Sequence, residues 1–145
     1  MTTGGSERLR VDSSGNVGIG TTSIDTKLEV NGTVMVDMIV NKAFYSNTSG
    51  ANVTIDWNNG NKQKITLGHN VTFTFTAPTS GVGSFTLKLT QDGTGSRTVT
   101  WPASVKWSGG GTAPTLSTTA AYVDIVSCAY DSGPVYYCQI GLDFR

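Results

Sequence analysis

The residues that could carry catalytic chemistry are few and widely spaced in this chain. His69 is the only histidine, and it lies in Gly68-His69-Asn70, a sequence typical of a tight turn. No two carboxylates lie within three positions of each other, whereas a glycosidase needs two carboxyl groups roughly 5–10 Å apart. We therefore expect no catalytic residues, no metal site and no cofactor, and we predict that the chain is not an enzyme. A glycan-cleaving site formed by carboxylates from different strands or subunits stays as an alternative.

Aromatic residues beside predicted turns are the better candidates for a binding site. The flat face of Trp or Tyr can pack against the C–H surface of a sugar, while amide and carboxylate groups bind its hydroxyls. Trp57 precedes the Asn58-Asn59-Gly60 turn, and Trp107 and Tyr136 adjoin loops that contain glycine. For Trp57 and Trp101, packing in a core or between subunits is the competing interpretation. The predicted binding residues are Trp107, Tyr136, Tyr137, Asp131, Trp57, Asn58 and Asn59.

The elements that would position these side chains are β-strands. In Val71–Thr76 and in Ser84–Thr90 every second residue is apolar, which gives a strand one apolar face and one polar Thr/Lys face. The link between them, Ala77–Gly83, holds one Pro and two Gly, so we predict an antiparallel hairpin. The other predicted strands are Val53–Trp57, Lys64–Leu67, Arg97–Trp101, Val105–Trp107, Tyr122–Tyr130 and Val135–Leu142.

Strands at this spacing, separated by turn residues, are typical of a sandwich or barrel. Residues 51–145 are numerous enough to form a core of their own. The predicted core residues are Val71, Phe73, Phe75, Phe85, Leu87, Leu89, Val99, Val123 and Ile125. The longest predicted loop is Ser108–Ala121, and loops of this length are often functional or mobile.

Composition excludes several classes of protein. Of the 145 residues, ten are basic and ten are acidic, and charged residues make up 14%, well below the ~25% that is usual for globular domains. A neutral chain without basic clusters lacks the electrostatic footprint of a nucleic-acid-binding protein. No apolar run reaches the ~18–20 residues of a membrane helix. We therefore expect neither nucleic-acid binding nor membrane insertion.

The N-terminal third contains short strand-like pieces with very little core. Residues 9–11, 17–19 and 28–30 each offer two apolar side chains, and the longer apolar run Thr33–Val40 follows them. Burial of two side chains, at roughly 1.5–3 kcal/mol each, does not offset the entropy lost when such a segment becomes ordered. The missing core must come from elsewhere, and other copies of the same chain are the simplest source.

The segment Glu7–Thr33 contains Glu-Arg-Leu-Arg-Val, then Gly-Asn-Val-Gly-Ile-Gly-Thr-Thr, then Lys-Leu-Glu-Val-Asn-Gly-Thr. It resembles a motif of bacteriophage tail-fibre and tailspike proteins. Ile24 stands where the family usually has Pro, which we interpret as a local change in one loop. Residues 51–145 resemble, more loosely, the small β-rich tip domains of phage tail fibres. In that family the motif joins a trimeric shaft to a C-terminal module, so the resemblance implies a homotrimer.

The resemblance also bears on the two cysteines. Cys128 and Cys138 flank the predicted turn Asp131–Pro134. An odd-length hairpin loop would place them directly opposite each other, and an even-length loop would place them on opposite faces. Phage proteins assemble in the reducing cytosol, so we expect two free, largely buried thiols, with a disulfide as the alternative.

Together these observations predict an all-β homotrimer in which short intertwined N-terminal strands precede an antiparallel β-sandwich. Residues 1–50 would form the fibre shaft, trimerisation and linker region, and residues 51–145 the receptor-binding tip. The predicted function is non-catalytic attachment of a phage to a host polysaccharide or outer-membrane protein. Its partners would be its own copies and the rest of the fibre, in a virion assembled in the host cytoplasm. The alternative is a fibre or surface-appendage subunit that recognises no receptor.

Overall fold

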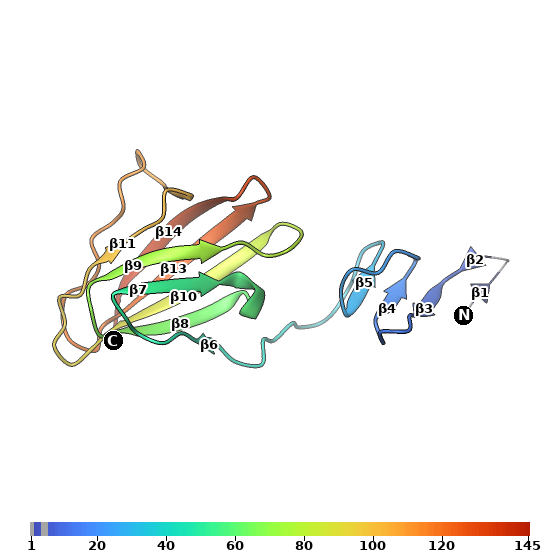
Figure 1. The fold of residues 1–145 in the computed structure, drawn as a ribbon, viewed down its shortest axis with the longest axis horizontal. Coiled ribbons are helices and arrows are strands. Elements are labelled where there is room, and N and C mark those ends of the chain that lie inside the picture. The colour runs from blue at the N-terminus through green and yellow to red at the C-terminus, as the bar shows by residue number, and fades with distance from the viewer. Residues whose placement is uncertain (1, 4–5) are drawn as a thin grey trace. The chain divides into compact units, whose positions relative to one another are not determined.

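The computed structural model describes residues 2–3 and 6–145, and within them it is all-β (Figure 1). Its contacts divide the chain into two units, Met1–Val40 and Asn41–Arg145, and each unit is described by itself. Among the described residues, no helix has the length and apolarity needed to cross a bilayer. Residues 41–50, predicted as part of the N-terminal region, lie in the second unit here, where β6 (Tyr45–Ser46) pairs with β8 (Lys62–Leu67).

The N-terminal unit is built from very short strands. β1 (Thr2–Thr3) pairs with β2 (Ser6–Glu7). β4 (Val17–Ile19) lies between β3 (Leu9–Val11), which is antiparallel to it, and β5 (Leu28–Val30), which is parallel to it. A Cβ on Gly18 would lie 2.8 Å from Cδ1 of Ile24, so Ile24 packs directly over this glycine. The residue that departs from the family motif thus covers the central strand of the small sheet.

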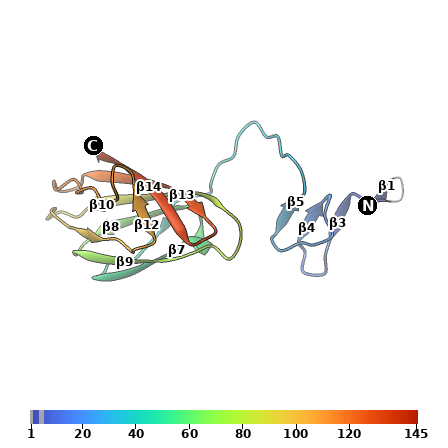
Figure 2. The same ribbon diagram turned by 90° about the horizontal axis from the view of Figure 1, so that it is seen from above.

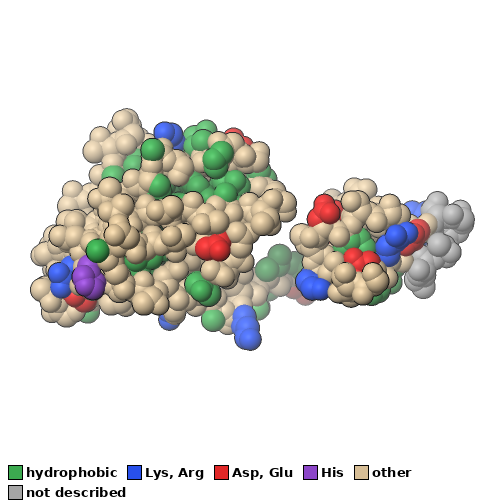
Figure 3. Space-filling model, viewed as in Figure 1, with side chains coloured by type: hydrophobic (Ala, Val, Ile, Leu, Met, Phe, Trp, Pro, Cys, Tyr) green, Lys and Arg blue, Asp and Glu red, His purple; other side chains and the backbone are tan. Residues whose placement is uncertain are grey.

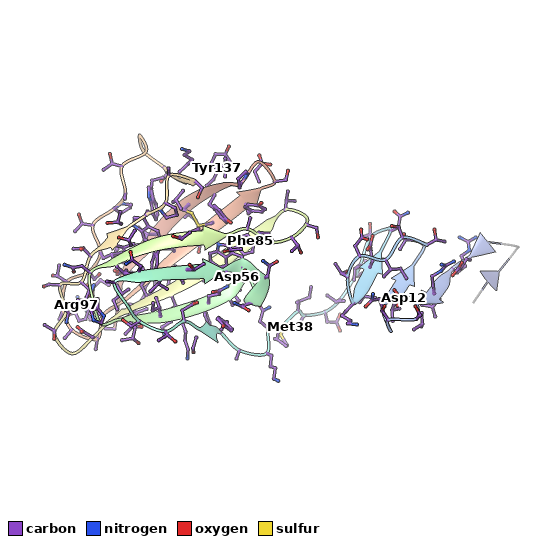
Figure 4. All side chains as sticks on the ribbon, viewed as in Figure 1. Asp12, Met38, Asp56, Phe85, Arg97 and Tyr137 are labelled. Atoms are coloured by element: carbon purple, nitrogen blue, oxygen red, sulfur yellow. A yellow bond between two sulfur atoms is a disulfide. The ribbon has the colours of Figure 1, made fainter. Side chains whose placement is uncertain are left out.

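The apolar run Thr33–Val40 forms no strand, contrary to its strand-like pattern. Its side chains are exposed, with 95% of Met35, 75% of Met38 and 80% of Ile39 accessible to solvent (Figure 4 labels Met38). Within one copy of the chain, no strand of the described residues pairs with this run. Its apolar surface is therefore left uncovered by the chain's own fold.

The C-terminal unit contains a six-stranded and a three-stranded sheet (Figures 1 and 2). The order in the large sheet is β12-β14-β13-β10-β8-β6, and the order in the small sheet is β11-β9-β7. All eight strands predicted for residues 51–145 are present. They are β7 (Asn52–Asp56), β8, β9 (Val71–Thr76), β10 (Gly83–Gln91), β11 (Val99–Thr100), β12 (Val105–Trp107), β13 (Val123–Asp131) and β14 (Val135–Phe144).

The predicted hairpin between β9 and β10 is wrong. β9 pairs with β7 and β11 in the small sheet, whereas β10 pairs with β8 and β13 in the large one. Both pairings of β9 are parallel, and the large sheet mixes parallel and antiparallel pairs, so the expectation of antiparallel sheets is also wrong. Alternation of apolar residues fixes which face of a strand is buried, but it does not choose the neighbouring strand.

Both sheets contribute side chains to one hydrophobic cluster. The predicted core residues Val71, Phe73, Phe85, Leu87 and Leu89 are buried in it, and Phe75 and Val99 pack against it while partly buried (Figure 4 labels Phe85). The prediction was wrong for Val123 and Ile125. In β13 the buried residues are the alternate ones, Asp124, Val126, Cys128 and Tyr130.

A buried carboxylate explains why the face of β13 was misjudged. Asp124 occupies a core-facing position of the strand, where an apolar residue was expected. Its oxygens accept hydrogen bonds from the backbone N–H and hydroxyl of Ser117, at 2.8 and 2.6 Å, and from the backbone N–H of Asp143, at 3.1 Å. These bonds satisfy the buried carboxylate and hold the second half of the long 108–121 loop against β13.

The two cysteines form a disulfide, which corrects the expectation of free thiols. Asp131 pairs with Val135, so three residues close the hairpin between β13 and β14. This odd-length loop places Cys128 directly opposite Cys138, with 4.1 Å between their Cα atoms. The hairpin geometry brings the two sulfur atoms together.

Candidate functional site

Three of the predicted receptor-binding residues are buried in the core, so their assignment to the surface was wrong. Trp57 stacks on Phe85 with ring centroids 4.6 Å apart, and Trp107 packs edge-on to Trp101 at 5.0 Å. The third is Tyr136, which is 1% exposed. Trp107 on β12 and Tyr136 on β14 occupy inward positions of the strand alternation. Trp57 begins the 3₁₀ turn after β7, and this turn directs its side chain inward.

Two polar atoms of these aromatic side chains are buried without a hydrogen-bond partner among the described residues. They are Nε1 of Trp57 and the hydroxyl oxygen of Tyr136. Burial raises the pKa of Tyr136 to about 12, with a smaller contribution from Tyr130 nearby. Both groups therefore belong to the packing of the core and are closed to a ligand at the surface.

The other four predicted residues are exposed and are divided between two turns. Asn58 has a structural role, since its side-chain nitrogen donates to Asp56 and to the carbonyl of Ala77, and its oxygen accepts from the N–H of Thr79. Asn59 is exposed at the end of the 3₁₀ turn Trp57–Asn59. This turn connects β7 to β8, whereas Asp131 and Tyr137 lie beside the turn that connects β13 to β14.

Tyr137 is the aromatic residue of the predicted set that remains on the surface. It is 56% exposed and points away from the core from the outer face of β14 (Figure 4). It borders a hollow of about 660 Å³ that is lined by outward side chains of the large sheet, including Lys62, Lys106 and Gln139. The set of predicted site residues missed these polar neighbours. The signal for them was the alternation itself, which places Lys62, Lys106 and Gln139 on the outer faces of their strands.

Neither the single histidine nor any acidic residue of the described chain lines this hollow. His69 lies outside the strands, as the turn pattern predicted. Among the described residues, no three His, Cys, Asp or Glu side chains gather in a way that could hold a metal ion. On the face visible in Figure 3, the Lys and Arg side chains are scattered.

One comparison with known proteins places the second unit. Residues 41–133 match a family described as "Putative phage tail fibre C-terminal domain". The chain belongs to this family. No curated protein and no solved structure matches the chain. The match begins at the boundary between the two units and covers every strand of the tail-fibre domain except β14. It supports a tail-fibre role and a component of the virion, and it agrees with the family that the N-terminal motif resembles.

Proposed function

We propose that the chain is the tip of a homotrimeric phage tail fibre and attaches the phage to a polysaccharide or outer-membrane protein of its host. The family match over residues 41–133 is the observation that carries this proposal. The shared hydrophobic cluster of the two sheets supports a β-sandwich scaffold. Loops and outer sheet faces on a rigid scaffold are where binding residues are commonly found. Assembly in the host cytoplasm is part of the same proposal.

The uncovered apolar run supports assembly into a trimer. Met35, Met38 and Ile39 lie in one segment of the N-terminal unit and expose most of their surface. Contiguous exposed apolar surface on a protein usually marks an interaction site. Other copies of the chain can cover the run at the same position in each subunit, which would fix the register of the fibre at its junction with the tip.

We propose that the tip binds without cleaving its receptor. In the C-terminal unit, Asp92 and Asp143 are paired with Arg97 and Arg145, and Asp124 is buried under hydrogen bonds. A glycosidase needs one carboxyl group free to donate a proton and a second one close to it. The chemistry of these carboxylates therefore favours binding over hydrolysis, and incubation with envelope polysaccharide should release no new reducing ends.

Light scattering tests the assembly. The full chain should have three times the monomer mass of 15.2 kDa, and this mass should survive dilution. Substitution of Met38→Asp together with Ile39→Asp should dissociate the trimer. A matched control is Val82→Asp, which alters an exposed apolar residue in a loop of the C-terminal unit and should leave the mass unchanged. A monomer for the unaltered chain would refute the trimer.

Cell retention tests the binding. Labelled protein should be retained on the surface of host cells, and the number of bound molecules should saturate. Trp107→Ala is unsuitable as a probe because this side chain is buried and its loss would destabilise the fold. Tyr137→Ala is the appropriate variant, since the side chain is exposed and its removal leaves the core intact. Absence of retention on every fraction of the host envelope would favour a purely structural fibre subunit.

A further inference from the structure

The outer face of the large sheet carries a concentration of lysines. The core-facing residues of β8 are Gln63, Ile65 and Leu67, so Lys62 and Lys64 point outward. The same alternation directs Lys88 of β10 and Lys106 of β12 to this side. We call these four lysines, with Thr86 and Tyr137 between them, the basic face.

The strand register brings three of the lysines close together. Lys64 pairs directly with Lys88 across β8 and β10, and Lys62 is opposite Thr86, two residues further along. Adjacent strands lie about 4.8 Å apart, and residues two positions apart on one strand are separated by roughly 6.6 Å. Like charges directly opposite each other destabilise a sheet. The fold therefore tolerates a repulsion here that a bound anion would relieve.

No carboxylate neutralises these lysines. The ion pairs of the described C-terminal unit join Asp92 to Arg97 and Asp143 to Arg145, and none involves a lysine. Lys62 donates one hydrogen bond, at 2.8 Å, to the hydroxyl of Thr86, and Lys106 donates one, at 2.9 Å, to the carbonyl of Ala103. Since an ammonium group has three N–H donors, both retain donors for a ligand.

Two hollows follow the basic face. The larger one, of about 660 Å³, brings Lys62 and Lys106 together with the ring of Tyr137 and the amide of Gln139. The smaller one, of about 310 Å³, is lined by Lys64 and Lys88 together with polar side chains that include Ser46, Asn47 and Thr66. Neither lining includes an acidic residue. Each hollow thus combines positive charge with neutral groups that can hydrogen-bond to hydroxyls.

We propose that the basic face binds an acidic polysaccharide of the host surface. Anionic groups of the glycan lie between Lys64 and Lys88 and beside Lys62, its hydroxyls meet the neutral polar side chains, and a sugar ring packs on Tyr137. This inference rests on the proposed receptor-binding function and specifies the class of receptor. A neutral glycan would leave the paired lysines uncompensated. Within the basic face a nucleic acid would find a single aromatic side chain, Tyr137, in place of a series of stacking platforms.

Polygalacturonate, a polysaccharide with carboxylate groups, is a suitable first probe, and neutral dextran is its matched control. Calorimetric titration of the full chain should detect binding of polygalacturonate and none of dextran, and added salt should weaken the binding. The double substitution Lys64→Gln and Lys88→Gln should reduce the affinity about tenfold or more. Lys42→Gln is the control variant, because Lys42 precedes β6 and lies outside the large sheet. It should leave the affinity unchanged.

A charge reversal separates loss of the site from loss of the fold. Lys64→Glu places a carboxylate opposite Lys88 and replaces a like-charge pair by an opposite-charge pair. We expect this variant to melt at the same or a higher temperature while it loses binding to polygalacturonate. Unchanged affinity in Lys64→Glu and in the double variant would overturn the inference. Equal affinity for an oligothymidine of similar charge would overturn the assignment to a glycan.

Cell retention distinguishes failure of this inference from failure of the proposed function. Retention of the unaltered chain that falls at least tenfold in Lys64→Glu supports both. Retention that persists in Lys64→Glu upholds receptor binding and overturns the basic face as its site. Absence of retention of the unaltered chain, with intact binding of polygalacturonate, refutes attachment but leaves the chemistry of the basic face in place.

Discussion

Substitution of Asp124 by Asn should destabilise the tail-fibre domain far more than its small change in shape suggests. The two oxygens of Asp124 accept three hydrogen bonds, one from the backbone N–H of Ser117, one from its hydroxyl and one from the N–H of Asp143. Asn retains only one acceptor oxygen. If that oxygen takes the position near the Ser117 hydroxyl, the amide nitrogen faces the N–H of Ser117. In the flipped orientation the nitrogen faces the N–H of Asp143 instead, but that N–H also donates to the hydroxyl oxygen of Ser117, at 3.0 Å.

The magnitude follows from this count. The first orientation leaves the backbone N–H of Ser117 without a partner, at about 1–3 kcal/mol, whereas the flipped orientation keeps that bond; in both, the remaining bonds lose the strengthening that a charged acceptor gives, ~1 kcal/mol each. We expect the Asn variant to lose about 1–3 kcal/mol of unfolding free energy, against the 5–15 kcal/mol that is typical of a whole domain. Ser117→Ala, the control, removes one donor and leaves both backbone N–H groups paired with Asp124, so it should cost less than Asp124→Asn.

Urea denaturation of both variants, monitored by tryptophan fluorescence, measures these losses. The midpoint should fall while the slope of free energy against urea stays constant. Since both residues act on one network, the double variant should cost less than the sum of the two single variants. A loss below ~1 kcal/mol for Asp124→Asn would refute the account, because it would mean that the charge of the carboxylate adds nothing to these hydrogen bonds.

Three further predictions concern the same domain. Replacement of Cys128 and Cys138 by Ser should cost about 2–3 kcal/mol in urea denaturation; reducing agent should lower the midpoint of the unaltered chain to the same value, and a chain insensitive to reducing agent would contradict the disulfide. Tyr136→Phe should be as stable as the unaltered chain or gain up to ~1 kcal/mol, because the hydroxyl that it removes has no partner among the described residues; a clear loss would reveal a hydrogen bond at that site. The hydrogen bond from Arg97, with those from Gly95 and Thr94, lowers the pKa of Asp92 to about 2, so its contribution to stability is complete above the ordinary value of 3.8 and is lost as the pH falls through about 2. Urea midpoints between pH 5 and pH 2 should therefore fall more steeply for the unaltered chain than for Asp92→Asn, and parallel curves would contradict the assignment.

The strands of the domain could be located from the sequence because each one has a local pattern of its own. Alternation in Val71–Thr76 and Ser84–Thr90, with turn residues between, was sufficient to place β9 and β10. Their partners could not be deduced in the same way. Every strand of this kind presents an apolar face, and the choice of neighbour depends on how the whole chain closes around the core. The connection Ala77–Val82 fits a turn to the adjacent strand as well as a crossing to the other sheet.

Three of the predicted binding residues, Trp57, Trp107 and Tyr136, are buried, because strand parity, and not proximity to a loop that contains glycine, decides which side chain faces solvent. Val105 and Trp107 lie on the buried face of β12, and Lys106 lies on its exposed face. An apolar Val105 on the same side as Trp107 indicated that the tryptophan is buried and the lysine is exposed. On β13, in contrast, parity was unhelpful, since Asp124 stands on the buried face and Ile125 on the outer one. The hydrogen bonds that make this carboxylate acceptable in the core come from Ser117 and Asp143, which lie outside the strand, seven and 19 residues away along the chain.

The division of side chains between the two faces of the large sheet links attachment to assembly. The large aromatic side chains of Trp57, Trp107 and Tyr136 face inward, so the basic face can hold a ligand mainly through lysines and neutral polar groups, with Tyr137 as its aromatic residue. Contacts between exposed charges are individually weak and are screened by salt. A single copy of the basic face should therefore hold a glycan poorly, whereas linked copies that engage together raise avidity by ~10²–10⁴. The double variant Met38→Asp and Ile39→Asp separates the affinity of a single copy from the avidity of linked copies. Its affinity for short oligogalacturonates should match that of the trimer, while its retention on cells should fall by about two orders of magnitude or more. Equal retention of monomer and trimer would mean that one site suffices, and that the apolar run at Thr33–Val40 serves the fibre alone.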